Sequence, residues 1–281
     1  MIRLVALDID GTLLDSQSRL PDANRAAIAR AIEAGVEVVL ATGRRFDFAR
    51  PIFERLPGPL TLILSNGAIV KTRDGETLTR RLLPRDVARS ILARVPGHRD
   101  GTAVVFDRPR EGQVVFEVID WEHPRHHRFF ASNRPYLAEA SPLETCLVED
   151  PIQVMFSGGC LEMRRLFDDL RRPSPATPPT YEVTLTEYVH RDFSLVDIIQ
   201  AGCSKGSTLA AWVEGRGLSR ADVMAVGDNL NDLQMLEFAG TPVLMGNALP
   251  ELRSRGWAAT ATNDDCGVAR AIETYIFGEA S

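Results

Sequence analysis

The feature that most constrains the fold is an apolar run near the N-terminus that ends in two acidic residues. Leu4-Val5-Ala6-Leu7 is followed at once by Asp8-Ile9-Asp10-Gly11-Thr12. A near-continuous apolar run of this length is typical of a strand buried on both faces of a parallel sheet. Ligands of open α/β sheets bind outside the carboxyl ends of the strands, so Asp8 and Asp10 are predicted to face a site. Gly11 allows the sharp turn through which both carboxylates can reach one centre.

The chemistry of that turn depends on how its negative charge is neutralised. Two carboxylates this close repel each other and raise one pKa, unless a hard cation such as Mg²⁺ compensates them. A lone Asp-x-Asp-Gly is nevertheless more often a polar turn with a glycine corner, because short motifs recur by chance. The rest of the chain decides between the two interpretations.

Strands and helices alternate after the acidic turn. A helix with apolar residues at Ala27, Ile28 and Ile32 ends at Gly35, a C-cap position, and strands are predicted at 36–41 and 60–64. The amphipathic segment between these strands carries Pro51, which predicts a late start or a kink. Each strand ends in small polar residues, and the pattern predicts a βαβαβ unit with a parallel sheet.

The middle of the chain departs from this alternation. A hairpin is predicted around Asp74-Gly75 and a helix from Pro84, and a proline-rich linker occupies 173–179. Strands are expected at 102–106, 113–119, 152–156, 181–186 and 193–199. A polar loop is expected between the strands at 113–119 and 152–156, and a helix at 161–170. We therefore expect an α/β fold: a Rossmann-like, doubly wound parallel core of residues 1–83 and 200–281, with an inserted α+β cap at 84–199.

Composition excludes several classes of protein. The 281 residues are 44% hydrophobic and 25% charged, which is typical of a globular chain. A net charge of −6 without a basic run interleaved with aromatics argues against nucleic acid as a partner. No apolar stretch approaches the ~20 residues of a membrane span, and no signal peptide is seen, so we expect no membrane partner and a cytoplasmic location. Four widely spaced cysteines indicate neither a zinc site nor a disulfide framework.

The predicted ends of the core strands and one helix start share polar chemistry. They carry a hydroxyl, two amides, a cation and three carboxylates, at Thr42, Asn66, Asn231, Lys205, Asp8, Asp10 and Asp228. Such groups are needed to hold a phosphoryl group and a divalent ion. Taken alone, each of these residues can be explained without a functional site, as part of a turn, as a helix N-cap or as a solvated lysine. Their joint occurrence in this order favours a site.

These motifs resemble those of the haloacid dehalogenase-like superfamily. The matching segments are Asp8-Ile9-Asp10-Gly11-Thr12, Ala41-Thr42-Gly43-Arg44, Ser65-Asn66-Gly67-Ala68, Ser204-Lys205-Gly206, Gly227-Asp228-Asn229-Leu230-Asn231-Asp232, Gly246-Asn247-Ala248 and 263–269. Within the superfamily the chain is similar to the Cof-type phosphatases, which carry a large α/β cap between the second and third motifs. The resemblance implies Mg²⁺-dependent hydrolysis of a small phosphorylated metabolite, such as a sugar phosphate.

The resemblance also implies a role for each matching residue. Asp8 is the expected nucleophile, which forms an aspartyl-phosphate, and Asp10 the general acid and base. Metal ligands are expected from Asp8, the backbone carbonyl of Asp10, and Asp228, with Asp232 orienting them from behind. Phosphate and substrate contacts are expected from Thr42, Gly43, Arg44, Asn66, Lys205 and Asn231. The inserted cap would act as a lid and determine specificity.

Several alternatives stay open at this point. A phosphosugar mutase would use the same aspartates, and a phospho-acceptor domain or a silent sugar-phosphate binding protein would share part of the pocket. The expected oligomeric state is a monomer or a small homo-oligomer. His123, His126 and His127 cluster in the cap, and we interpret them as a solvated polar face rather than as metal ligands, because no cysteine or acidic ligand completes a set.

Overall fold

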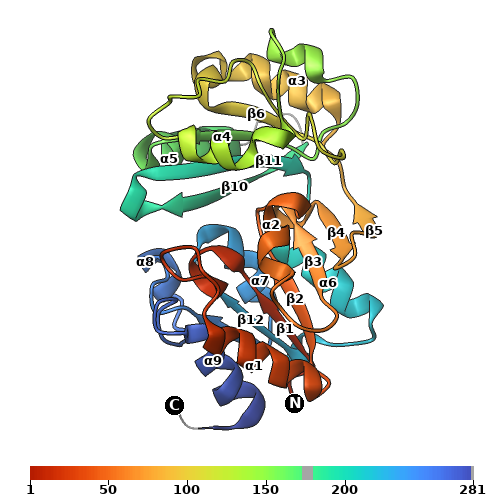
Figure 1. Cartoon of the computed structure of the whole chain (residues 1–281), viewed down its shortest axis with the longest axis vertical. Helices are drawn as coiled ribbons and strands as arrows, with labels where there is room; N and C mark the ends of the chain where they lie inside the picture. Colours follow the sequence, from red (N-terminus) through yellow and green to blue (C-terminus); the bar gives the residue numbers. More distant parts are fainter. Residues whose placement is uncertain (173–179, 280–281) are drawn as a thin grey trace. The chain divides into compact units, whose positions relative to one another are not determined.

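The computed structural model describes residues 1–172 and 180–279, which divide into two compact units (Figure 1). The core unit comprises Met1–Arg80 and Ser204–Ser281, and the inserted unit comprises Arg81–Cys203. The proline-rich linker expected at 173–179 lies outside the described residues.

The core unit contains a mainly parallel sheet with the strand order β14-β13-β12-β1-β2-β3-β4-β5. Its strands are β1 (Leu4–Leu7), β2 (Glu37–Ala41), β3 (Thr61–Leu64), β4 (Ile69–Thr72), β5 (Thr77–Arg80), β12 (Val223–Gly227), β13 (Thr241–Leu244) and β14 (Ala258–Ala259). β1 pairs in parallel with β2 on one side and β12 on the other. All four of its residues are buried, as the apolar run predicts. The hairpin of β4 and β5 is antiparallel and forms one edge.

Helices flank this sheet on both faces, which confirms the doubly wound α/β class (Figure 1). They are α1 (Asp22–Glu33), α2 (Phe46–Phe53), α6 (Lys205–Gly215), α7 (Leu233–Phe238), α8 (Pro250–Arg253) and α9 (Gly267–Ile272). Leu209 of α6 and Leu236 of α7 pack in one core cluster with Leu4 and Ala6 of β1. α1 packs against β2 and α9. α2 starts at Phe46 and runs through Pro51, so the late start is wrong, and the kink at Pro51 stays a prediction.

The end of α1 shows how local chemistry fixes the chain's path. Gly35 has φ of +82°, a conformation that L side chains disfavour. Its N–H donates to the carbonyl of Ile32, and the N–H of Val36 donates to the carbonyl of Ala31. This is the Schellman pattern of helix termination, and it turns the chain directly into β2.

The inserted unit contains a second sheet with the strand order β10-β11-β9-β6-β7-β8. Its strands are β6 (Thr102–Val105), β7 (Val114–Phe116), β8 (Leu137–Glu139), β9 (Gln153–Gly158), β10 (Tyr181–Tyr188) and β11 (Phe193–Gln200), and its helices are α3 (Arg85–Arg94), α4 (His127–Asn133) and α5 (Cys160–Arg171). All pairings are antiparallel except that of β7 with β8. The unit is therefore α+β.

Two details of the inserted unit differ from the expectation. The strand expected at 113–119 is only three residues long, because Val118 is exposed and does not join the sheet. The segment expected as a polar loop contains α4 and β8. Both are so short that no helical or alternating apolar period develops in the sequence.

Candidate active site

The site begins where β1 ends. Asp8 directly follows the strand and is only 4% exposed. The chain then turns at Gly11, which has φ of +81°. A Cβ atom at this position would overlap the carboxylate of Asp228, so glycine serves both the turn and the close approach of the loop that follows β12.

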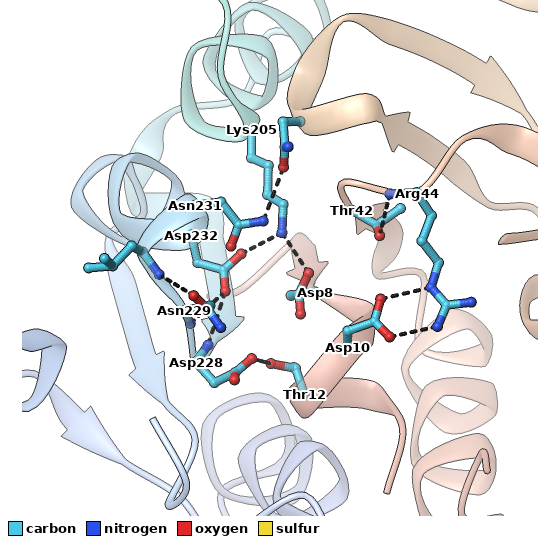
Figure 2. A network of polar contacts seen from close by, with 12 residues as sticks. Asp8, Asp10, Thr12, Thr42, Arg44, Lys205, Asp228, Asn229, Asn231 and Asp232 are labelled. Carbon is cyan, nitrogen blue, oxygen red and sulfur yellow. Dashed lines mark hydrogen bonds and ion pairs between the residues drawn. The ribbon is translucent and has the colours of Figure 1, made fainter. Parts of the chain in front are cut away.

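Three buried carboxylates converge at the ends of the neighbouring strands β1 and β12 (Figure 2). Asp8, Asp228 and Asp232 each offer an oxygen, and these oxygens lie within 4.8 Å of one another. Asp232 thus lies within the carboxylate cluster, and its role in orienting the metal ligands stays a prediction. The carboxylate of Asp10 points elsewhere, so only its backbone carbonyl stays a predicted metal ligand.

Lys205 crosses this cluster from the first position of α6. Its Nζ donates to Oδ1 of Asp8 at 2.6 Å and to Oδ1 of Asp232 at 2.7 Å, and the side chain has no exposed area. The helix start is held by a reciprocal cap, in which the Ser204 hydroxyl accepts from the N–H of Ser207 and the Ser207 hydroxyl accepts from the N–H of Ser204. The explanation of Lys205 as a solvated residue is therefore wrong.

The electrostatics of the cluster indicate surplus negative charge. Burial, followed by repulsion from Asp232, raises the pKa of Asp8 to about 7, against the opposing effect of Lys205. Burial and the nearby Asp8 also hold the pKa of Asp228 well above its usual range. Burial alone would lower the pKa of Lys205, but the carboxylates of Asp232 and Asp8 outweigh it and raise that pKa. One ammonium does not neutralise three carboxylates, and their hard oxygen donors fit a cation such as Mg²⁺.

Asp10 has a different partner. Arg44 Nε donates to its Oδ2 at 2.7 Å and Arg44 Nη2 donates to its Oδ1 at 2.6 Å, a bidentate ion pair (Figure 2). The guanidinium of Arg44 also lies over the ring of Phe48, 4.3 Å from the centroid. Arg44 was expected to contact phosphate, whereas the structure places its guanidinium on the predicted acid and base.

The remaining predicted residues meet beside this pair. Thr42 is buried, and its Oγ1 accepts the backbone N–H of Arg44 at 3.1 Å. Asn66 is fully buried with φ of +55°, and its N–H donates to the carbonyl of Thr42. Asn231 Nδ2 donates to Oδ1 of Asn66 at 3.0 Å, and a Cβ at Gly43 would lie 3.2 Å from the same oxygen. The structure thus brings together the loops after β2, β3 and β12.

One residue of the site received no role from the sequence. Thr12 is buried, and its Oγ1 donates to Oδ1 of Asp228 at 2.9 Å. Its position in the Asp8-Ile9-Asp10-Gly11-Thr12 motif was the available signal, but its partner lies 216 positions away. Asp232 is fixed in a related way, because its Oδ2 accepts the N–H groups of Asp228 and Asn229.

The histidine cluster of the inserted unit is not a uniformly solvated face. His126 is buried, its ring stacks on His123 with centroids 4.2 Å apart, and its Nε2 lies 3.0 Å from the hydroxyl of Ser157. Burial, helped by His123 and Arg125, lowers the pKa of His126 to about 4. The solvated-face interpretation is wrong for His126 and holds for the exposed His127. Across the described residues, the carboxylate cluster is the group with metal-binding geometry.

Comparisons with known proteins show the family to which the chain belongs. The family model of haloacid dehalogenase-like hydrolases matches residues 5–272. An HMP-PP phosphatase of Serratia proteamaculans is 32% identical over 90% of this chain and 87% of its own length. Pyridoxal phosphate phosphatase YbhA of Escherichia coli is 30% identical over 98% of both chains.

Solved structures show the same fold. A haloacid dehalogenase-like hydrolase from Bacteroides thetaiotaomicron superposes with a TM-score of 0.76 and 25% identity, covering 97% of this chain and 99% of its own. Within the described part of the chain, no helix has the length and apolar character needed to cross a membrane. The expectation of a phosphatase is confirmed at the level of enzyme class, and the chain belongs to the haloacid dehalogenase-like hydrolases.

Proposed function

We propose that the protein hydrolyses phosphomonoesters of small metabolites in two steps, with Asp8 as the nucleophile and Mg²⁺ as the cofactor. The observation that carries the proposal is the buried cluster in which Lys205 bridges Asp8 and Asp232 beside Asp228. Burying three carboxylates around one ammonium is costly for stability, so the arrangement calls for a functional reason. Phosphoryl transfer supplies one, because it needs a nucleophile and concentrated positive charge.

In the first step an oxygen of Asp8 attacks phosphorus. The new Asp8–phosphorus bond forms as the ester oxygen leaves, and Asp10 gives a proton to that oxygen. In the second step water attacks phosphorus and Asp10 takes a proton from the water. The bond to Asp8 breaks, which releases inorganic phosphate and restores both aspartates.

The metal and the phosphate would be held by different groups. Asp8, the backbone carbonyl of Asp10, and Asp228 would ligate Mg²⁺, which when bound supplies the positive charge that the cluster lacks. Lys205 would add a point charge beside the transferred phosphoryl group, held in place by its two carboxylates. Thr42 and the backbone at Gly43 would donate to the other phosphate oxygens.

The substrate class is proposed from the relatives. They are named as phosphatases of HMP-PP and of pyridoxal phosphate, which supports a small phosphorylated metabolite. We propose that the inserted unit selects among such metabolites and acts as a lid, as expected for a cap. A cytoplasmic location likewise stays a prediction of the sequence.

Phosphate release from a panel of phosphomonoesters tests the proposal. The panel contains sugar phosphates, nucleotides, pyridoxal phosphate and an aryl phosphate, each with Mg²⁺ and with excess chelator. We expect phosphate release from at least one metabolite, and we expect chelation to abolish it. The rate of release should fall by about 10⁴-fold or more in Asp8→Asn, because the amide cannot act as the nucleophile. Asp22→Asn, at an exposed aspartate, is the matched control and should keep full activity. Chelator-resistant turnover, or an active Asp8→Asn protein, would contradict the proposal. A requirement for a bisphosphorylated sugar activator would instead reveal a mutase.

A further inference from the structure

We propose that Arg44 is a positioning residue, which holds the carboxylate of Asp10 in one orientation and does not bind the transferred phosphate. This inference rests on the proposed function, since it assigns Arg44 a task in the acid and base steps of that reaction. It concerns contacts within the core unit alone.

Arg44 and Asp10 form an ion pair with bidentate geometry. Two parallel N–H···O contacts of 2.6 and 2.7 Å join the guanidinium fork to both oxygens of Asp10. A bidentate pair fixes the plane of a carboxylate as well as its distance, which a single contact does not. The side chains are only 15% and 22% exposed, so the pair is partly shielded from water.

Arg44 is itself held in place by the protein. Its guanidinium lies over the ring of Phe48, and Nη1 donates to the Phe48 carbonyl at 3.3 Å. Its backbone N–H donates to Oγ1 of Thr42. Nε, Nη1 and Nη2 are thus all engaged by protein oxygens, which fix the position of the guanidinium. An orienting group needs such support to hold its partner within a fraction of an ångström.

The two cations of the site have different carboxylate partners (Figure 2). Lys205 donates hydrogen bonds to Asp8 and Asp232, whereas the Asp10 carboxylate forms its ion pair with Arg44. A carboxylate that must exchange protons with the leaving oxygen and then with water has to stay off the metal. The ion pair with Arg44 keeps the Asp10 carboxylate away from the metal site. Lys205 remains the cation that would contact the phosphate.

A double-mutant cycle tests this role in the full-length protein with Mg²⁺. The variants are Arg44→Met, which keeps an apolar stem over Phe48, Arg44→Lys, which keeps the charge without the fork, Asp10→Asn, and the Arg44→Met/Asp10→Asn double variant. For an alkyl phosphomonoester we expect Arg44→Met to lower kcat about 100-fold, within the range of general acid–base catalysis, with KM changed less than about 3-fold. In the Asp10→Asn background the same change should cost less than about 3-fold, because Arg44 acts through Asp10. Arg44→Lys should not restore the rate.

Two further readouts separate positioning from phosphate binding. The inhibition constant of inorganic phosphate should stay within about 3-fold of wild type in Arg44→Met. The loss in kcat/KM should be much smaller for an aryl phosphate, whose leaving group needs little protonation, than for the alkyl ester. Arg50→Met is the matched control, because Arg50 also pairs with an aspartate and lies over a phenylalanine but does not contact Asp10.

The opposite pattern would overturn the inference. If Arg44 binds phosphate, KM and the phosphate inhibition constant should rise about 10-fold or more, equally for both esters and undiminished in the Asp10→Asn background. Thermal melting identifies a variant that fails to fold, and Arg44→Gln, which keeps one donor, then replaces Arg44→Met in the cycle. A wild-type protein without phosphatase activity would contradict the proposed function instead, so the two failures are distinguishable.

Discussion

Both units of this protein bury polar side chains, but they arrange them in different ways. In the core unit, Asp8, Lys205 and Asp232 come from three segments far apart in the chain and meet at one point. In the inserted unit, the polar contacts that we compare with this cluster join elements that neighbour each other in its own fold. Arg164 of α5 binds Glu187 of β10, and Gln153 of β9 donates to Asp197 of β11 at 2.7 Å.

This difference distinguishes polar contacts that hold two elements together from polar groups that are expected to carry out chemistry. A polar contact between two neighbouring elements, such as that of Gln153 with Asp197, fixes how the two elements pack. A cluster with three carboxylates and one ammonium leaves charge uncompensated, as the raised pKa values of Asp8 and Asp228 indicate. Perturbed groups that gather at the carboxyl ends of parallel strands mark a functional site. We therefore expect the chemistry to take place in the core unit.

After the loss of the nucleophile Asp8 itself, a large effect is expected at Lys205, the cation at the centre of the core cluster. Lys205→Arg keeps the charge, but a planar guanidinium does not fit the fully buried space between two carboxylates. We expect a loss of about 100-fold in kcat/KM, about 3 kcal/mol of transition-state stabilisation. Steady-state kinetics with thermal melting measure it.

The chain offers a matched control, because Lys71 is its only other lysine. Lys71 lies in β4, and its Nζ is 5.5 Å from the ring centroid of Phe46. Lys71→Arg should leave kcat/KM within about 2-fold, as a surface substitution does. A wild-type kcat/KM in Lys205→Arg would show that Lys205 does not lie in the phosphate site.

A smaller effect is expected where a neutral group supports the cluster. Thr12→Val removes the hydroxyl that donates to Asp228 while keeping the side-chain shape. Groups that orient a metal ligand typically contribute 10- to 100-fold to affinity, so we expect Mg²⁺ affinity to fall by roughly 10-fold. Titration of activity against Mg²⁺ measures the change, with the exposed Thr79→Val as control. Equal metal affinities of Thr12→Val and wild type would mean that the Thr12 hydroxyl does not orient a metal ligand.

The smallest effect is a contrast in pH dependence between the two units. The pKa of Asp8 rises in the fold from 3.8 to about 7, so without metal its contribution to stability is full below about pH 4 and is lost as the pH rises through 7. The pKa of His126 falls from 6.5 to about 4, so its contribution is full above about pH 6.5 and is lost as the pH falls through 4. The two units should therefore respond to pH with opposite signs.

Thermal melting of metal-free protein between pH 4 and 8 measures this contrast. The Tm of wild type relative to Asp8→Asn should decrease as the pH rises, and the Tm relative to His126→Gln should increase. Saturating Mg²⁺ should flatten the first difference and leave the second unchanged. Two differences with the same sign would contradict the contrast.

Local chemistry explains which features could be predicted from the sequence. The apolar run of β1, the turn at Gly11 and the helix stop at Gly35 depend on neighbouring residues, and the structure shows each of them. The fold class followed from the alternation of such elements. Short elements such as α4 and β8 could not be predicted, because three to seven residues carry no clear period.

Partners of charged side chains were harder to predict, since they depend on the three-dimensional fold. Arg44 carried positive charge beside a phosphate motif, yet it binds an aspartate 34 positions away. Asp232 was placed behind the metal ligands, yet it shares Lys205 with Asp8. His126 stands in a polar run of sequence, but its ring packs near Phe130 and Phe193. Sequence indicated which groups matter, and folding determined which of them pair.

The central claim is that Asp8 carries the phosphoryl group between the two steps. The most direct measurement is an acid quench during the first turnover with a good phosphomonoester substrate, followed by mass spectrometry of the peptide that contains residues 4–12. We predict a phosphate on Asp8 that is absent in Asp8→Asn and accumulates in Asp10→Asn with an aryl phosphate, because the second step then lacks its base. An active enzyme whose Asp8 is never phosphorylated at any quench time, in wild type or in Asp10→Asn, would contradict the claim.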